Sequence, residues 1–178
     1  MATSLQEHNT ISSPLKSIFS DFFELTKARL ALSVVFSSLA GFLIAADEIN
    51  FDVIFLLVMG GYCMVGSSNI FNQIIEKDSD AVMNRTKNRP IPSGRVSISV
   101  AFLVAVFLTM IGVVVLYRIN ATTALFGSIS IFIYACIYTP LKQKTPLSVF
   151  VGAIPGAIPF MLGCLLYTSD AADELLGV

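Results

Sequence analysis

The sequence carries few charges and little that would keep a chain in water. Only 13% of its 178 residues are charged and the mean hydropathy is +0.79, whereas soluble domains carry about 25% charged residues. A water-soluble globule is therefore excluded, and so is a disordered chain, because a chain this apolar cannot stay solvated. The 11 Lys and Arg are balanced by 12 Asp and Glu, which leaves no excess of positive charge for a nucleic acid partner. The bilayer is the expected solvent.

Histidine and cysteine are also scarce. The single histidine, His8, lies in a polar N-terminal stretch, which excludes most histidine-based metal sites and acid–base mechanisms. The three cysteines, Cys63, Cys136 and Cys164, lie in apolar stretches without Cys-x-x-Cys spacing, and this predicts neither a disulfide framework nor a zinc site. Any chemistry must therefore come from carboxylates and cations.

Apolar segments dominate the rest of the chain. A helix needs about 20 mostly apolar residues to cross the hydrocarbon core of a membrane, and five segments qualify: 30–46, 51–75, 98–117, 121–139 and 147–167. The second is long and becomes polar in its last two turns, which predicts a helix that leaves the membrane while still helical. The predicted fold class is an all-α membrane protein, without a separate soluble domain.

Residues 1–24 are predicted to form a cytoplasmic tail and an amphipathic interfacial helix. The stretch up to Ser13 is polar and lacks the basic segment and cleavage site of a signal peptide, so it is interpreted as a flexible tail. Apolar residues then recur at helical spacing, at Leu15, Ile18, Phe19 and Phe22. This helix either lies on the membrane surface or packs beneath the transmembrane bundle.

The distribution of basic residues predicts the orientation, because short cytoplasmic loops retain Lys and Arg. Ten of the 11 lie before the first span, between spans two and three, or between spans four and five, and only Arg118 lies on the other side. The N-terminus is therefore predicted to be cytoplasmic. All three basic segments then share one membrane face, as a site for an anionic substrate requires.

The polar end of the second span is the first candidate site. Asn72, Glu76 and Asp80 are four residues apart, which places them along one stripe of a helix, whereas Asp78 points elsewhere. Two carboxylates and an amide oxygen suit Mg²⁺, which is usually bridged to protein by one or two carboxylates plus substrate phosphates. The alternative is a solvated helix end whose acids pair with neighbouring cations.

A basic, proline-stiffened loop follows this stripe. Its candidate anion donors are Arg85, Arg89 and Arg95, with prolines at positions 90 and 92. An acidic helix end facing a basic loop can hold a metal ion and a diphosphate together, because the ion neutralises part of the phosphate charge while guanidinium groups bind the remaining oxygens. A purely topogenic loop would explain the cations but not the acids beside them.

Three separated blocks resemble the intramembrane aromatic prenyltransferase superfamily over residues 15–163. The blocks are Leu25–Arg29, Asn72–Arg95 and Tyr138–Pro159, and the third favours the branch of the family that modifies haem. The resemblance implies a nine-helix bundle, of which this chain supplies the N-terminal part with about five transmembrane helices. It implies that the family's second acidic motif lies beyond this chain. The transmembrane prenyltransferase domain is placed at residues 25–163.

Two positions depart from the family pattern. Glu76 stands where the family usually has Asp, which keeps the charge and the oxygen ligands and adds a methylene, so metal binding should survive. Ala28 stands where the family usually has Pro between Lys27 and Arg29, which affects backbone stiffness more than charge.

Residues 164–178 are predicted to be non-native. Cys164 to Glu174 break the membrane pattern, and they read as one translation frame of a transposase-type sequencing adapter. The alternative is a genuine short C-terminal helix. Under the first interpretation Asp170, Asp173 and Glu174 are not the missing acidic motif.

The resemblance implies Mg²⁺-dependent transfer of a farnesyl group from farnesyl diphosphate to a vinyl group of haem B, in a bacterial inner membrane. Asn72, Glu76 and Asp80 would hold the metal and, with Arg85 and Arg89, form the catalytic set. Arg95 and Lys142 would bind substrate. Lys27 and Arg29 would meet haem propionates or, as the favoured interpretation, anchor the first span at lipid headgroups. Aromatic faces for a carbocation could come from Phe71, Phe132, Tyr134 and Tyr138, although ordinary packing is favoured for each.

The expected partners are thus farnesyl diphosphate, haem B and membrane lipid, with no nucleic acid and with Mg²⁺ as cofactor. The fragment alone is expected to be inactive. Two alternatives stay open. One is another aromatic prenyltransferase of the same family, and the other is a piece of a transporter or channel in which Glu76, Asp78 and Asp80 form a cation vestibule.

Overall fold

The computed structural model describes the backbone of residues 14–176 and the side chains of residues 18–166. The predicted tail up to Ser13 and the side chains of residues 167–178 lie outside the described residues. Every regular element of the described part is a helix, with no strand, which confirms the predicted fold class. The elements are α1 (Pro14–Leu25), α2 (Ala28–Ala45), α3 (Phe51–Ile75), α4 (Lys77–Val82), α5 (Ile98–Tyr117), α6 (Ala121–Phe132), the π-helical turn η1 (Ile133–Tyr138), α7 (Thr139–Lys142) and α8 (Ser148–Leu176).

Five helical stretches of the described chain are long and apolar enough to cross a membrane. Four begin or end within two residues of the predicted spans, and the fourth span continues through η1 and α7 to Lys142. Helix α8 continues without a break to Leu176, past the predicted end of the fifth span. The origin of residues 164–178 stays a prediction.

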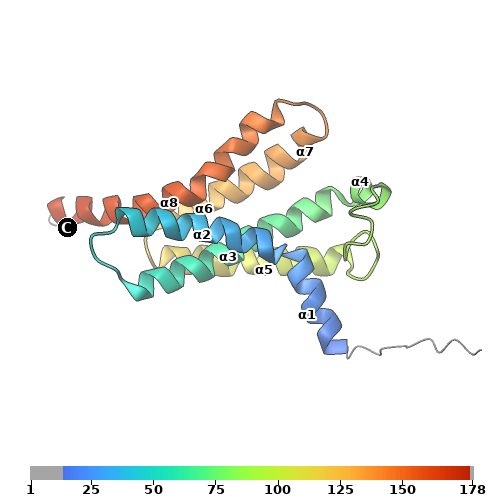
Figure 1. Ribbon diagram of the computed structural model, residues 1–178, viewed down its shortest axis with the longest axis horizontal. Helices are drawn as coiled ribbons and strands as arrows, with labels where there is room; N and C mark the ends of the chain where they lie inside the picture. The colour runs from blue at the N-terminus through green and yellow to red at the C-terminus, as the bar shows by residue number, and fades with distance from the viewer. Residues whose placement is uncertain (1–13, 177–178) are drawn as a thin grey trace, which may run out of the picture.

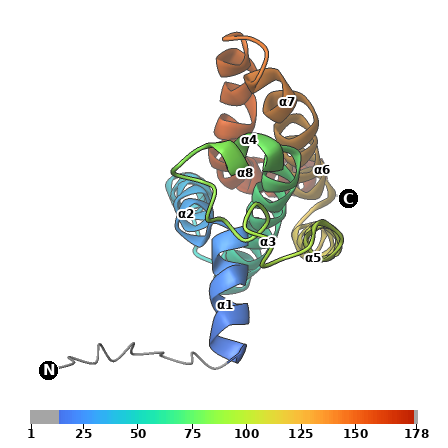
Figure 2. The ribbon, with the colours of Figure 1, turned by 90° about the vertical axis from the view of Figure 1, so that its right-hand side faces the viewer.

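Successive spans run in opposite directions, so three connections gather at one end of the molecule. Figure 1 shows α1, α4 and α7 at the same end of the long axis, and Figure 2 looks onto that end, with α4 near its centre. This arrangement confirms that the basic segments predicted to share one membrane face lie together. Whether that face is cytoplasmic stays a prediction.

Helix α3 is the central element, and it packs most extensively against α5. Glycine permits this close approach: a Cβ on Gly60 of α3 would lie 2.8 Å from a Leu116 methyl, and one on Gly112 of α5 would lie 2.7 Å from the Met64 sulfur. Because lipid provides no hydrophobic drive for helix association, such small residues let the helices gain van der Waals contact instead.

Helix α1 packs against the bundle and also keeps an exposed apolar edge, so it has features of both locations that its amphipathic pattern left open. Leu25 is buried in the core formed with α3 and α5, and Phe22 packs against the same cluster. Ile18, Phe19 and Phe23 are exposed on the other side. The helix is thus docked on the bundle through one apolar edge and leaves a second edge free for the membrane interface.

Candidate active site at the end of helix α3

The three predicted oxygen ligands lie on one buried stripe. The α-helix ends at Ile75 and α4 begins at Lys77, so the predicted uninterrupted helix is broken at Glu76. The stripe survives the break, because Glu76 N–H donates to the Asn72 carbonyl at 2.9 Å and Asp80 N–H donates to the Glu76 carbonyl at 2.8 Å. Exposure is 2% for Asn72, 7% for Glu76 and 4% for Asp80. A solvated helix end, the alternative interpretation, does not fit such burial.

Each of these side chains is paired with a cation from a different segment. Lys27 Nζ donates to Asn72 Oδ1 at 2.9 Å, and Lys142 Nζ donates to Glu76 Oε1 at 3.1 Å. Arg89 Nη1 donates to Asp80 Oδ2 at 2.5 Å. Two carboxylates thus face three cations, which leaves the site with a positive excess at neutral pH and suits it to an anion.

The loop after α4 is folded so that Arg89 turns back to Asp80. Thr86 is buried and its hydroxyl donates to the Asp80 carbonyl at 2.9 Å, while Arg89 N–H donates to the Thr86 carbonyl at 3.0 Å. Ile91 inserts into the apolar cluster that also contains Ile70 of α3. A hydrogen-bonded turn on one side of Arg89 and an apolar anchor on the other therefore fix its position.

A π-helical turn sets the position of Lys142. Pro140 has no N–H and cannot continue the regular hydrogen-bond ladder, and the chain before it widens into η1 (Ile133–Tyr138). The Thr139 hydroxyl donates to the Tyr134 carbonyl at 2.8 Å and accepts from Asn72 Nδ2 at 3.3 Å. Single π turns of this kind are frequent at functional sites, and here the turn joins the fourth span to the stripe on α3.

Lys27 faces the interior of the site. It lies between α1 and α2 with φ 49° and ψ 56°, and it is the only described residue other than glycine with a positive φ. Burial, reinforced by the Arg89 guanidinium, lowers the pKa of the Lys27 ammonium to about 8, although Glu76 and Asp80 act in the opposite direction. The favoured interpretation of Lys27 as a headgroup anchor is therefore wrong.

Three predicted site residues are not brought into this cluster. Arg85 and Arg29 are exposed, and no hydrogen bond of either side chain occurs among the described residues. Arg95 instead binds helix α1: its guanidinium pairs with Asp21 and, at 2.8 Å, with Glu24. The bond to Glu24 is also the main reason why the pKa of Arg95 is raised. Arg95 thus holds the loop to α1.

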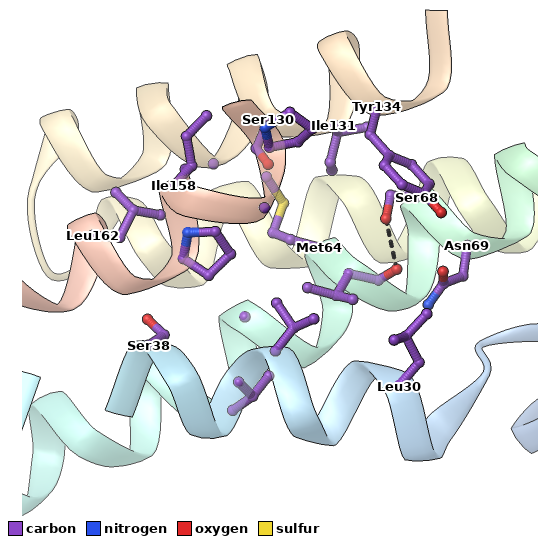
Figure 3. Close-up of a pocket in the computed structure, with 18 of the residues that line it drawn as sticks. Leu30, Ser38, Met64, Ser68, Asn69, Ser130, Ile131, Tyr134, Ile158 and Leu162 are labelled. Atoms are coloured by element: carbon purple, nitrogen blue, oxygen red, sulfur yellow. Dashed lines mark hydrogen bonds between the residues drawn. The ribbon is translucent and has the colours of Figure 1, made fainter. Parts of the chain in front are cut away.

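An apolar cavity of about 620 Å³ lies next to the stripe, between α2, α3, α6 and α8. Figure 3 shows Asn69 and Tyr134 at one end of it and Ser38, Ile158 and Leu162 at the other. Asn69 is one helical turn from Asn72 on α3, so the cavity begins beside the charged cluster. Most of its lining is aliphatic or glycine, and Pro155 and Pro159 of α8 also line it.

The four candidate aromatic residues divide into two groups. Tyr134 and Tyr138 line the cavity and stack on each other, with ring centroids 5.3 Å apart. Phe71 packs edge-on against Phe102, and Phe132 is exposed. The favoured interpretation as packing or lipid contact fits the two phenylalanines, whereas the two tyrosines face the space beside the charged cluster.

Sequence reasoning missed several polar residues around the stripe. Thr139 contacts Asn72 directly, and Asn69 and Gln73 of α3 bind backbone carbonyls at the α1–α2 joint. These residues could have been found from the sequence, because they are polar residues inside predicted spans, and those of α3 lie at helical spacing from the acidic stripe.

The donor set fits Mg²⁺ with an incomplete protein shell. No three His, Cys, Asp or Glu side chains converge in the part of the chain that the structure describes. A Mg²⁺ ion would therefore take Glu76, Asp80 and the Asn72 amide oxygen, and complete its octahedron with water and phosphate oxygens, as this ion usually does.

These features define a multi-pass, all-helical membrane protein with a metal-compatible anion site at the mouth of an apolar cavity. A model described as the UbiA prenyltransferase family matches residues 34–177. The chain belongs to the UbiA prenyltransferase family, which confirms the resemblance drawn from its motifs.

Curated relatives support the haem branch of the resemblance. A protein named Protoheme IX farnesyltransferase from Flavobacterium psychrophilum is 64% identical over 164 residues, covering 90% of this chain and 55% of that protein. Relatives of the same name from Christiangramia forsetii and Flavobacterium johnsoniae are 64% and 58% identical and cover 92% and 93% of this chain, and 55% and 56% of their own length. The chain thus spans about half the length of the curated relatives it matches.

Two solved structures share the fold. A structure described as digeranylgeranylglyceryl phosphate synthase aligns with TM-score 0.77 and 19% identity, over 83% of this chain and 53% of that one. A UbiA homologue from Archaeoglobus fulgidus bound to GPP and Mg²⁺ aligns with TM-score 0.74 and 16% identity, over 83% of this chain and 54% of that one.

Proposed function

We propose that the protein to which this chain belongs transfers a farnesyl group from farnesyl diphosphate to a vinyl group of haem B, giving haem O, with Mg²⁺ as cofactor. The substrates follow from the names of the relatives and from the resemblance of the third sequence block. The prenyl diphosphate and the metal are also supported by the fold neighbour bound to GPP and Mg²⁺.

One observation carries the proposal: three cations from three different segments converge on a buried stripe of two carboxylates and an amide. Lys27, Arg89 and Lys142 each pair with one member of that stripe. When a diphosphate enters, these donors can move from the stripe to phosphate oxygens, because each is held by a single hydrogen-bonded contact. Arg85, at the edge of the loop, is proposed to join them from solvent, as are Arg29 and Arg95 for the outer part of a substrate.

Breaking the allylic carbon–oxygen bond places negative charge on the departing diphosphate. Guanidinium and ammonium donors that have closed on the diphosphate therefore stabilise the transition state more than the ground state. Bound Mg²⁺ would neutralise part of the same charge. The electron pair of the broken bond leaves with the diphosphate, and the π electrons of the haem B vinyl group form the new carbon–carbon bond with the allylic carbon. The cation left on the haem side chain then takes up water, which loses a proton and becomes the hydroxyl group of haem O.

The allylic cation needs an environment without water. The cavity beside Asn69 is apolar over most of its surface, and its aliphatic lining is suited to the farnesyl chain. The stacked faces of Tyr134 and Tyr138 lie near the charged end of this cavity, where an aromatic quadrupole stabilises positive charge. These two tyrosines are therefore proposed to face the reacting carbon.

The membrane placement is part of the proposal. The site lies at the end of the bundle that collects ten of the 11 basic residues, and this bias supports a cytoplasmic location for that end. The protein is accordingly proposed to lie in a bacterial inner membrane with its N-terminus cytoplasmic and lipid around the five spans.

Haem O formation tests the proposal directly. The locus, read to its natural stop codon, is expressed, and membranes are incubated with haem B, farnesyl diphosphate and Mg²⁺ before haem O is measured by mass. Asp80→Asn and Glu76→Gln should each lower the rate by about 10²–10³-fold, because each would weaken the hold on Mg²⁺, the group proposed to stabilise the developing negative charge. Asp78→Asn, at an exposed acid beside them, is the matched control and should keep the wild-type rate.

Two results would contradict the assignment. Normal farnesylation by the Glu76→Gln/Asp80→Asn protein would place the metal site elsewhere. Failure of the unsubstituted protein to form haem O, while it transfers the prenyl group to another aromatic acceptor, would favour a different branch of the family.

A further inference from the structure

The joint between α1 and α2 interrupts the regular i→i+4 hydrogen bonds of the carbonyls of Glu24, Leu25 and Thr26, and the Glu24 carbonyl instead accepts Lys27 N–H at 3.2 Å. Helix α1 ends at Leu25 and α2 begins at Ala28, with Lys27 in the left-handed region between them. Glycine is the residue most often found in the left-handed backbone conformation, because the Cβ of any other residue is crowded there. A lysine at this position is therefore held by its surroundings.

Two amide side chains of α3 bind those carbonyls. Gln73 Nε2 donates to the Leu25 carbonyl at 2.7 Å and to the Glu24 carbonyl at 3.3 Å, and Asn69 Nδ2 donates to the Thr26 carbonyl at 2.9 Å. Gln73 is fully buried and Asn69 is 2% exposed. The last three carbonyls before Lys27 are thus fixed by side chains that are one turn apart on a single helix.

The same helix carries the group that Lys27 reaches. Asn72 lies between Asn69 and Gln73 in the sequence, and its amide oxygen accepts the Lys27 ammonium at 2.9 Å. Helix α3 therefore carries Asn72, which binds the Lys27 ammonium, and also Asn69 and Gln73, which bind the backbone just before Lys27. These two amide side chains are called the clamp below. Released from the clamp, the left-handed turn would relax and the ammonium would leave Asn72.

We propose that Asn69 and Gln73 are positioning residues, which hold the left-handed turn at Lys27 and so place its ammonium where a diphosphate binds. This inference rests on the proposed function, because it takes the charged cluster to be the diphosphate site. Neither residue touches the reacting atoms. Their effect on the ligand passes through Lys27.

A double-mutant cycle tests that route, because residues that act through one another are not additive. The probe is inorganic pyrophosphate with Mg²⁺, titrated calorimetrically into the purified full-length protein in detergent. Lys27→Met should weaken binding by about tenfold or more, as expected for one charge-assisted hydrogen bond. Gln73→Met, which keeps the side-chain length and removes both donors, should weaken it by about threefold or more. The double variant should bind no more weakly than Lys27→Met alone.

A matched control separates positioning from general loosening. Ser67 is another fully buried polar residue of α3, but it binds the Ala105 carbonyl at 2.8 Å and Thr109 at 2.6 Å, on the side of α5. Ser67→Ala should lower the unfolding temperature and leave pyrophosphate affinity unchanged. If Gln73→Met does not fold, Asn69→Ala, which removes a single hydrogen bond of the clamp, takes its place in the cycle.

The outcomes distinguish the two proposals. Wild-type affinity in Gln73→Met, additive losses in the double variant, or an equal loss in Ser67→Ala would each overturn the positioning role while leaving the diphosphate site intact. An intact cycle in a protein that makes no haem O would overturn the proposed acceptor and keep the positioning role. A protein that binds no Mg²⁺–pyrophosphate at all would overturn both.

Discussion

The depth of the apolar cavity is expected to depend on Gly127. Met64 of α3 lines the cavity, and its side chain lies against two glycines: a Cβ on Gly112 would lie 2.7 Å from the Met64 sulfur, and one on Gly127 would lie 3.2 Å from its terminal methyl. The same Cβ would lie 3.1 Å from a Leu116 methyl, and Leu116 also lines the cavity, so Gly127→Ala is expected to push the ends of Met64 and Leu116 into it. Gly127 lies about 10 Å along α6 from Tyr134, at 1.5 Å per residue, so the effect falls on the far part of a bound chain.

The expected magnitude follows from the buried area that the substrate loses. If the displaced Met64 methyl excludes two carbon groups of the last isoprene unit, the loss is about 1.6 kcal/mol at about 0.8 kcal/mol for each buried methylene. This corresponds to about a 15-fold fall in kcat/KM for farnesyl diphosphate. The shorter geranyl diphosphate should lose little, because its chain ends before Gly127.

The assay compares kcat/KM for geranyl, farnesyl and geranylgeranyl diphosphate in membranes that contain the full-length protein. Met64→Ala should act in the opposite direction and improve the relative use of the longest chain. Met110→Ala, at an exposed position of α5 outside the cavity, is the control for this substitution. An equal loss for geranyl and farnesyl diphosphate in Gly127→Ala would refute the reasoning, because it would mean general damage and not a shortened cavity.

Three further predictions concern the charged end of the bundle. Arg89→Gln should lower the free energy of unfolding by about 1–3 kcal/mol, because it leaves the buried Asp80 carboxylate unpaired; thermal unfolding in detergent measures this, and adding Asp80→Asn should recover part of the loss. Arg95→Ala should change overall stability by less than about 1 kcal/mol, since its ion pairs with Asp21 and Glu24 are partly exposed, but amide hydrogen exchange in residues 14–25 should become faster. Removing divalent metal with a chelator should abolish haem O formation and excess Mg²⁺ should restore it; turnover that survives complete chelation would contradict the metal assignment.

The spans and the acidic stripe could be predicted because both depend on local patterns. Burial in lipid requires long apolar runs, so the five spans can be recognised without knowledge of their neighbours. The stripe from Asn72 to Asp80 depends only on helical spacing, and it persists even though the helix is interrupted at Glu76. The helical spacing of the three side chains is preserved because the i→i+4 backbone hydrogen bonds continue across the break.

The cations could not be assigned in the same way, because their partners are distant in the sequence. Lys27 and Lys142 are separated from their partners Asn72 and Glu76 by 45 and 66 residues. The local sequence does not distinguish Arg95 from the other two arginines of the loop as a candidate anion donor. In the structure, however, Arg95 binds Asp21 of α1, which lies 74 residues earlier in the chain. Sequence composition predicts that such groups share one face, while packing decides which of them meet.

The π turn that precedes Pro140 makes the spacing between Tyr134 and Lys142 a functional quantity. A π turn closes on i→i+5 hydrogen bonds and rotates less per residue than the roughly 100° of an α-helix, so regularising this stretch to α-helix without removing a residue would rotate the lysine away from Glu76. The tyrosine pair would then keep its place beside the cavity while the ion pair was lost. Substitutions that regularise the backbone hydrogen bonds of this turn should accordingly be less tolerated than substitutions of its lipid-facing side chains.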